Sequence, residues 1–223
     1  GVCRDGGGVT RRTFLLAGGA LAGLSALRGQ AEAPPRIVIF GDSLAEGYGL
    51  PPDQGLVPQL QGWLDERGIP ARLVNAGLSG DSSFGGRVRI RWALRSGADG
   101  VVIELGGNDF LAGFGLRDTE RNLDSIIVQA KRGGRPVLLV GVVPPAQYMA
   151  HDPADVARMW QRLAERHGVL LHPDLFAPLW RAPQSQWGSF LQDDGIHLSA
   201  SGVSLAVGDL GPMLARLAAQ AAD

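Results

Sequence analysis

The chain has 223 residues, 45% of them hydrophobic, a length and composition that suit one domain with a substantial core. Its formal net charge of −1 argues against a nucleic-acid-binding protein, which would normally carry a basic excess. The single cysteine, Cys3, excludes an intrachain disulfide and a cysteine-based zinc site.

The first 33 residues have the layout of an export signal. Arg11 and Arg12 precede a weakly apolar run, residues 15–27, and Ala31-Glu32-Ala33 follows as a small-residue cleavage pattern. The alternative is a membrane anchor, but an apolar run of this length falls short of the roughly 20 residues that cross a bilayer. We therefore expect residues 1–33 to be a twin-arginine-type signal peptide, with the twin-arginine export machinery as a transient partner. Residues 34–223 would then be periplasmic or secreted, without stable membrane insertion after cleavage.

From Arg36 onward, short apolar segments alternate with amphipathic ones. The pattern predicts strands at 37–40, 72–75, 101–105, 137–142 and 169–171, and helices at 57–67, 84–95, 119–132, 155–167 and 199–219. Strands that are apolar throughout indicate a parallel sheet covered on both faces. We expect an α/β fold, a three-layer α/β/α sandwich with about five parallel strands in one domain. On the helix at 84–95, the arginines at positions 87, 89, 91 and 95 are expected to face solvent.

Polar residues flanked by glycines follow the predicted strands. In chain order they are Gly41-Asp42-Ser43-Leu44, Gly80-Asp81, Gly107-Asn108-Asp109 and Asp194-Gly195-Ile196-His197. Open parallel sheets bind ligands at the carboxyl ends of their strands, so these residues are expected to gather at one edge. A set of merely structural loops would not need this convergence.

Each of these residues has two interpretations. Ser43 is either a helix N-cap or a nucleophile, and His197 is either a packing residue or a general base. Asp194 lies three residues before His197, a spacing that lets a carboxylate orient an imidazole or merely cap a turn. The backbone N–H groups of Ser43 and Gly80 and the amide of Asn108 either form an oxyanion hole or serve local turns.

Taken together, the four blocks resemble the GDSL family of lipases and esterases, also called SGNH hydrolases. The family's four residues correspond to Ser43, Gly80, Asn108 and His197, and its acid corresponds to Asp194. The resemblance covers the chain from Arg36 onward and is closest to the acyl-CoA thioesterase I / arylesterase / lysophospholipase L1 group.

The resemblance implies a flavodoxin-like α/β/α sandwich and a serine hydrolase that needs no cofactor and no metal. It would cleave carboxylic esters or thioesters of small-molecule or lipid substrates through an acyl-enzyme on Ser43. Asp194 and His197 would complete the catalytic triad, and Ser43, Gly80 and Asn108 would form the oxyanion hole. The segments 110–117 and 147–153 are expected to wall the acyl pocket.

Three alternatives remain at this point. One is a carbohydrate O-acetyl esterase of the same family, and another is a non-catalytic secreted protein that binds lipid or carbohydrate. The third is a two-metal phosphoesterase that would use the donors Asp42, Asp81, Asn108, Asp109 and His197.

Overall fold

A computed structural model describes residues 33–144 and 146–223. The predicted signal peptide therefore lies outside the described residues, except for Ala33. In the described ranges, no helix combines the length and the apolar character that a bilayer crossing requires.

The centre of the described chain is a five-stranded parallel sheet with the order β2-β1-β3-β4-β5. The strands are β1 (Arg36–Gly41), β2 (Arg72–Gly77), β3 (Gly100–Glu104), β4 (Val137–Val140) and β5 (Leu170–His172). The residues of β3 and β4 are buried throughout, as are all of β1 except Arg36. The α/β class and the parallel sheet predicted from the apolar runs are confirmed.

The helices alternate with the strands along the chain. They are α1 (Ser43–Glu46), α2 (Leu56–Glu66), α3 (Ser83–Ala93), α4 (Gly107–Leu111), α5 (Leu116–Ala130), α6 (Pro153–His167), α7 (Ala177–Arg181), α8 (Trp187–Phe190) and α9 (Ala200–Ala222), with short 3₁₀ turns at Arg132–Gly134, Ala146–Tyr148 and Gln184–Gln186. Several helices begin a few residues before the predicted position. In α6, for example, the side chain of Asp152 accepts a hydrogen bond from the Ala154 N–H and Pro153 occupies the first turn, so the helix starts at Pro153.

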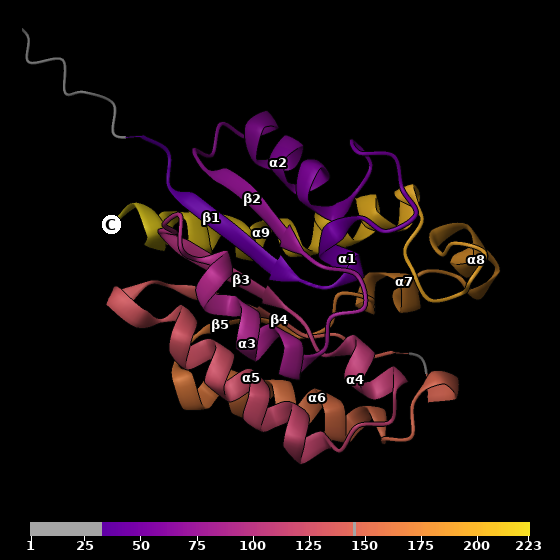
Figure 1. The fold of residues 1–223 in the computed structure, drawn as a ribbon. Coiled ribbons are helices and arrows are strands. Elements are labelled where there is room, and N and C mark those ends of the chain that lie inside the picture. The colour runs from indigo at the N-terminus through magenta and orange to yellow at the C-terminus, as the bar shows by residue number, and fades with distance from the viewer. Residues whose placement is uncertain (1–32, 145) are drawn as a thin grey trace, which may run out of the picture. The chain divides into compact units, whose positions relative to one another are not determined.

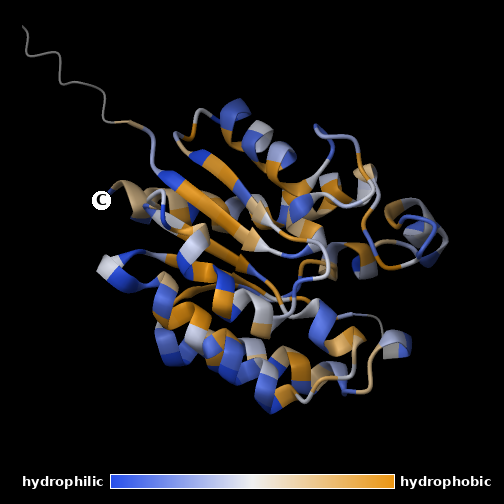
Figure 2. Cartoon of the chain, in the orientation of Figure 1, coloured by the Kyte–Doolittle hydropathy of each residue, from blue (hydrophilic) through white to orange (hydrophobic). Residues whose placement is uncertain are grey.

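The helices cover the two faces of the sheet as separate layers (Figure 1). Helices α2 and α9 pack on one face, and α3, α5 and α6 pack on the other. Colouring by hydropathy shows apolar strands at the centre and polar residues on the outer sides of the helices (Figure 2). Each face has its own apolar cluster, and both clusters consist of residues between Ile37 and Ala218. The core of the described residues is thus divided between the two faces of the sheet.

The strand order fixes where a ligand can bind. In the order 2-1-3-4-5, the chain leaves β1 toward one edge of the sheet and later returns to β3 on the other side of β1. Such a switch point leaves a crevice between the carboxyl ends of the two strands. The short helix α1 follows β1 and the short helix α4 follows β3, so both helices begin at this crevice.

Candidate active site

Ser43 lies directly at the crevice, as the first residue of α1. The carboxylate of Asp42 caps this helix by accepting a hydrogen bond from the Leu44 N–H at 3.1 Å. The turn is tight, because a Cβ on Gly41 would lie 2.5 Å from the backbone oxygen of Glu104. Ser43 is thus the first helical residue, and Asp42, not Ser43, is the N-cap.

His197 and Asp194 approach Ser43 from the loop before α9. The His197 Nε2 atom lies 2.9 Å from the Ser43 Oγ, and its Nδ1 atom lies 2.6 Å from the Asp194 Oδ2. The other Asp194 oxygen accepts the backbone N–H groups of Ile196 and His197, each at 2.9 Å. Burial raises the pKa of Asp194, but these hydrogen bonds outweigh it and hold the pKa below its usual value. The structure therefore joins the three predicted residues in one hydrogen-bonded chain.

The Asn108 side chain lies beside this chain, at the start of α4. Its Nδ2 donates to the backbone oxygen of Asp81 at 2.9 Å and to the Asp42 Oδ2 at 3.3 Å. Gly80 precedes Asp81 and has a φ of 78°, the left-handed conformation that favours glycine. The bond from Asn108 to Asp81 therefore ties the Gly80 loop to the crevice. Gly80 itself is not among the residues that line the cavity described below.

A buried carboxyl pair lies behind the nucleophile, which the sequence reasoning missed. Glu104, the last residue of β3, is fully buried, and its Oε2 lies 3.4 Å from the backbone nitrogen of Asp42. In the described part of the chain, its Oε1 has no hydrogen-bond partner. Burial raises the pKa of Asp42 to about 7, although the Leu44 N–H and His197 lower it. Burial and the neighbouring Asp42 also raise the pKa of Glu104. The signal in the sequence was a glutamate inside an otherwise apolar strand.

Arg89 corrects the expectation that the arginines of α3 face solvent. Its side chain is 17% exposed, and its Nε donates to the buried carboxylate of Asp81 at 2.9 Å. It also donates to the backbone oxygens of Ala76, at 2.8 Å, and Gly41, at 3.1 Å, and lies over the Phe40 ring. Arg89 therefore connects the ends of β1 and β2 to the loop that contains Gly80.

The donors of a two-metal site are not assembled. Asp81 is paired with Arg89, and both oxygens of Asp109 accept hydrogen bonds from Ser83, with Thr119 as a further donor. Among the described residues, no group of three or more His, Cys, Asp and Glu side chains is arranged to hold a metal ion. The arrangement gives no support to the phosphoesterase alternative.

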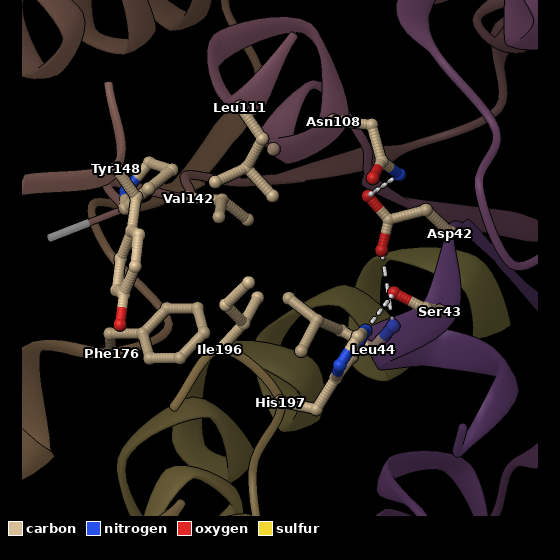
Figure 3. Close-up of a pocket in the computed structure, with 12 residues that line it drawn as sticks. Asp42, Ser43, Leu44, Asn108, Leu111, Val142, Tyr148, Phe176, Ile196 and His197 are labelled. Atoms are coloured by element: carbon tan, nitrogen blue, oxygen red, sulfur yellow. Dashed lines mark hydrogen bonds between the residues drawn. The ribbon is translucent and has the colours of Figure 1, made fainter. Parts of the chain in front are cut away.

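A cavity of about 260 Å³ opens next to Ser43 and His197. Apart from the site residues, it is lined by Leu44, Leu111, Val142, Pro144, Tyr148, Phe176 and Ile196. Tyr148 and Phe176 lie across the cavity from Ser43, whereas Leu111 lies on the same short helix, α4, as Asn108 (Figure 3). Both segments that were expected to wall the pocket contribute, one through Leu111 and the other through Tyr148.

The far wall of the cavity is held in place by Asp174, which the sequence reasoning also missed. Its Oδ1 accepts the backbone N–H groups of Val143 at 3.2 Å and Phe176 at 3.1 Å. Burial raises the pKa of Asp174 to about 6. One carboxyl group thus links the loop after β4 to the segment after β5.

Known proteins resemble this chain over most of its length. The model of the GDSL-like lipase/acylhydrolase family matches residues 39–205. Esterase TesA of Pseudomonas aeruginosa is 36% identical over 184 residues, which cover 82% of this chain and 88% of that protein. Thioesterase 1/protease 1/lysophospholipase L1 of Escherichia coli K12 is 32% identical over 169 residues, covering 75% of this chain and 77% of that protein. The crystal structure of TesA aligns with a TM-score of 0.74 at 32% identity, covering 82% of this chain and 99% of that one. The family match includes Ser43, Asn108 and His197 alike.

Proposed function

This chain belongs to the GDSL-like lipase/acylhydrolase family and is a serine ester hydrolase, and on that premise we propose that Ser43 is its nucleophile. The observation that carries the proposal is the hydrogen-bonded chain from Asp194 through His197 to Ser43, at the edge of an apolar cavity. A nucleophile within hydrogen-bond reach of a base, itself oriented by a third group, is the arrangement that acyl transfer requires.

The proposed reaction has two halves. His197 accepts the Ser43 proton as Oγ forms a bond to the acyl carbon, and the imidazolium then protonates the departing alcohol or thiol as its bond to the acyl carbon breaks. Water, activated by the same imidazole, then attacks the acyl-enzyme, releases the acid and restores Ser43. Asp194 remains ionised throughout and stabilises the imidazolium, in keeping with its lowered pKa.

We assign the oxyanion hole to the backbone N–H groups of Ser43 and Gly80 and to the amide of Asn108. In the described ranges, neither backbone N–H donates to a backbone acceptor, so both are available to a ligand. The Asn108 Nδ2 keeps its shorter bond to Asp81 and would redirect the hydrogen that now points to Asp42 at 3.3 Å. Asn108→Ala should lower kcat roughly 10²- to 10³-fold.

The lining of the cavity supports an acyl group as the part of the substrate that binds there. Its side chains are aliphatic or aromatic apart from the site residues themselves, and its volume is at the small end for ligand pockets. We propose short to medium acyl chains on carboxylic esters or thioesters, including lysophospholipid and acyl-CoA types. A carbohydrate O-acetyl esterase would need polar groups to hold a sugar, and the cavity lining offers few.

Export is a separate proposal, supported by the sequence of residues 1–33 alone. We propose that the chain leaves the cytoplasm through the twin-arginine machinery and acts in the periplasm or outside the cell. Replacing Arg11 and Arg12 by lysine and measuring the enzyme in cell fractions tests this proposal. The variant should stay in the cytoplasm, and undiminished export would overturn the assignment.

The chemistry is tested by hydrolysis of p-nitrophenyl esters of graded chain length. Ser43→Ala should lower kcat on the order of 10⁶-fold, with circular dichroism used to show that the variant is folded. Residual activity within tenfold of the parent would rule out Ser43 as nucleophile. Tight binding of esters by a parent that does not turn them over would instead favour the binding-protein alternative.

A further inference from the structure

The outer face of α3 carries a row of large apolar side chains. Phe84, Val88 and Trp92 follow one another at intervals of four residues, which places them on one side of the helix. They are 61%, 69% and 62% exposed. The opposite side of α3 packs into the protein through Ser83, Gly86 and Ile90, so the exposed row adds nothing to the core.

Arginines surround this row. Arg87, Arg91 and Arg95 are all exposed, and the Arg95 guanidinium lies 4.5 Å from the centre of the Trp92 ring. The sequence of α3 contains no acidic residue. We call these six residues (Phe84, Arg87, Val88, Arg91, Trp92 and Arg95) the α3 face.

The neighbouring helix α5 does not neutralise the α3 face. Two of its carboxylates, Glu120 and Asp124, are bound by Arg162 and Arg166 of α6, on the side away from α3. The third, Asp118, pairs with Arg121 of α5 itself. Arg87 instead contacts the amide oxygen of Asn122 at 3.2 Å. On a chain with a net charge of −1, the α3 face is therefore a local concentration of positive charge mixed with apolar surface.

We propose that the α3 face binds the surface of an anionic phospholipid membrane. Aromatic and aliphatic side chains bordered by arginine, on one side of a helix, are the composition that inserts at the boundary between headgroups and acyl chains. Each arginine gains further from anionic headgroups, because the surface potential of such a membrane is negative. A second copy of the chain is a poorer occupant, since two α3 faces in contact would bring arginine against arginine.

The position of α3 gives such binding a consequence for catalysis, and this consequence rests on the proposed function. The helix begins two residues after Asp81, whose backbone oxygen holds Asn108. The side chain of Leu78, in the loop before this helix, is exposed as well. A chain bound through the α3 face would hold its crevice beside the lipid surface from which lysophospholipid substrates come.

Co-sedimentation of residues 33–223 with phosphatidylglycerol vesicles, and separately with phosphatidylcholine vesicles, tests the proposal. The parent should bind the anionic vesicles more tightly, and the preference should weaken as salt is added. Replacing Arg87, Arg91 and Arg95 by glutamine should weaken binding to the anionic vesicles on the order of 100-fold. Replacing Phe84, Val88 and Trp92 by serine should weaken it roughly tenfold or more.

A matched control variant replaces Arg67, Arg132 and Arg158 by glutamine. These arginines are exposed on other surfaces, so the control changes the net charge equally and should bind like the parent. All variants should hydrolyse p-nitrophenyl acetate at the parent rate, which shows that they are folded.

Equal loss of vesicle binding in the control, or unchanged binding in both α3 variants, would overturn the proposal. So would a parent dimer that becomes monomeric in the α3 variants without change in vesicle binding, because the face would then be a contact between copies. A parent that binds anionic vesicles but hydrolyses no ester would contradict the proposed function and leave the docking surface standing.

Discussion

Asp42→Asn should remove a pH dependence of stability that originates next to the nucleophile. Asp42 is only 2% exposed, and burial raises its pKa from 3.8 to about 7. The folded protein therefore keeps this proton up to about pH 7, whereas the unfolded chain releases it near pH 4. Between these values the folded state binds more protons, so its stability falls as the pH rises.

The size of the effect follows from the two pKa values. At about 1.4 kcal/mol per pH unit, the rise from 3.8 to about 7 corresponds to roughly 4 kcal/mol of unfolding free energy. The contribution of Asp42 is intact below about pH 4 and lost by about pH 7. Glu104, whose pKa is raised as well, should act in the same direction.

The assay compares urea unfolding of the parent and the Asn variant at pH 4, 6 and 8. The new amide faces the Asn108 Nδ2 and adds a cost that does not depend on pH, so the informative quantity is the difference between the two proteins at each pH. Relative to the parent, Asp42→Asn should gain up to about 4 kcal/mol between pH 4 and pH 8. Asp53→Asn, in an exposed loop, controls for the loss of one carboxylate. A difference that stays constant, or that shifts against the variant as the pH rises, would refute the reasoning.

Three further predictions concern packing and the cavity. Arg89→Met leaves the buried Asp81 carboxylate unpaired, so the free energy of unfolding measured in urea should fall by about 3–5 kcal/mol. The same substitution should cost less in a protein that already carries Asp81→Asn. Equal losses in both proteins would mean that the two side chains are not coupled. Gly77→Ala places a methyl group 2.3 Å from a backbone nitrogen of α1 and should lower the thermal midpoint measured by circular dichroism. Gly62→Ala, in the middle of α2 where a methyl group meets no neighbouring atom, should raise the midpoint. A Gly77 variant as stable as the parent would show that α1 can move. Leu111→Trp should lower kcat/KM for octanoate esters at least tenfold and spare acetate esters, since Leu111 lines the cavity; a uniform loss would place Leu111 in the chemistry and not in chain-length selection.

Much of the fold could be predicted because its strands are unbroken apolar runs between polar or glycine-rich segments. Residues 37–40 and 101–105 are buried on both faces of the sheet, and a short continuous apolar run is the pattern that predicts such a strand. Short helices such as α7 and α8 escaped prediction, because segments of four or five residues show no helical period.

Within the site, sequence position located the residues that follow strands but not those that support them from behind. Ser43 follows Gly41 at the end of β1, where a ligand site is expected, and His197 follows Gly195 in the long segment after β5. In the sequence, Arg89 cannot be distinguished from the exposed arginines of α3. It is buried because the backbone oxygens of Gly41 and Ala76 lie within its reach in the folded protein. The role of Glu104 likewise depends on β3, which places its carboxyl group beside the turn that contains Asp42 and Ser43. Such roles come from tertiary contacts, which no local pattern contains.

The distance along the chain between Ser43 and His197 has a consequence for the timing of activity. The two residues are 154 positions apart, so the nucleophile is synthesised early and its base only near the end of translation. Until residues 194–197 have emerged and folded against α1, Ser43 has no partner to take its proton. A ribosome-bound chain that ends before this segment contains all five strands but not the base, so it should not hydrolyse esters. The onset of hydrolysis would therefore report that residues 194–197 have reached Ser43.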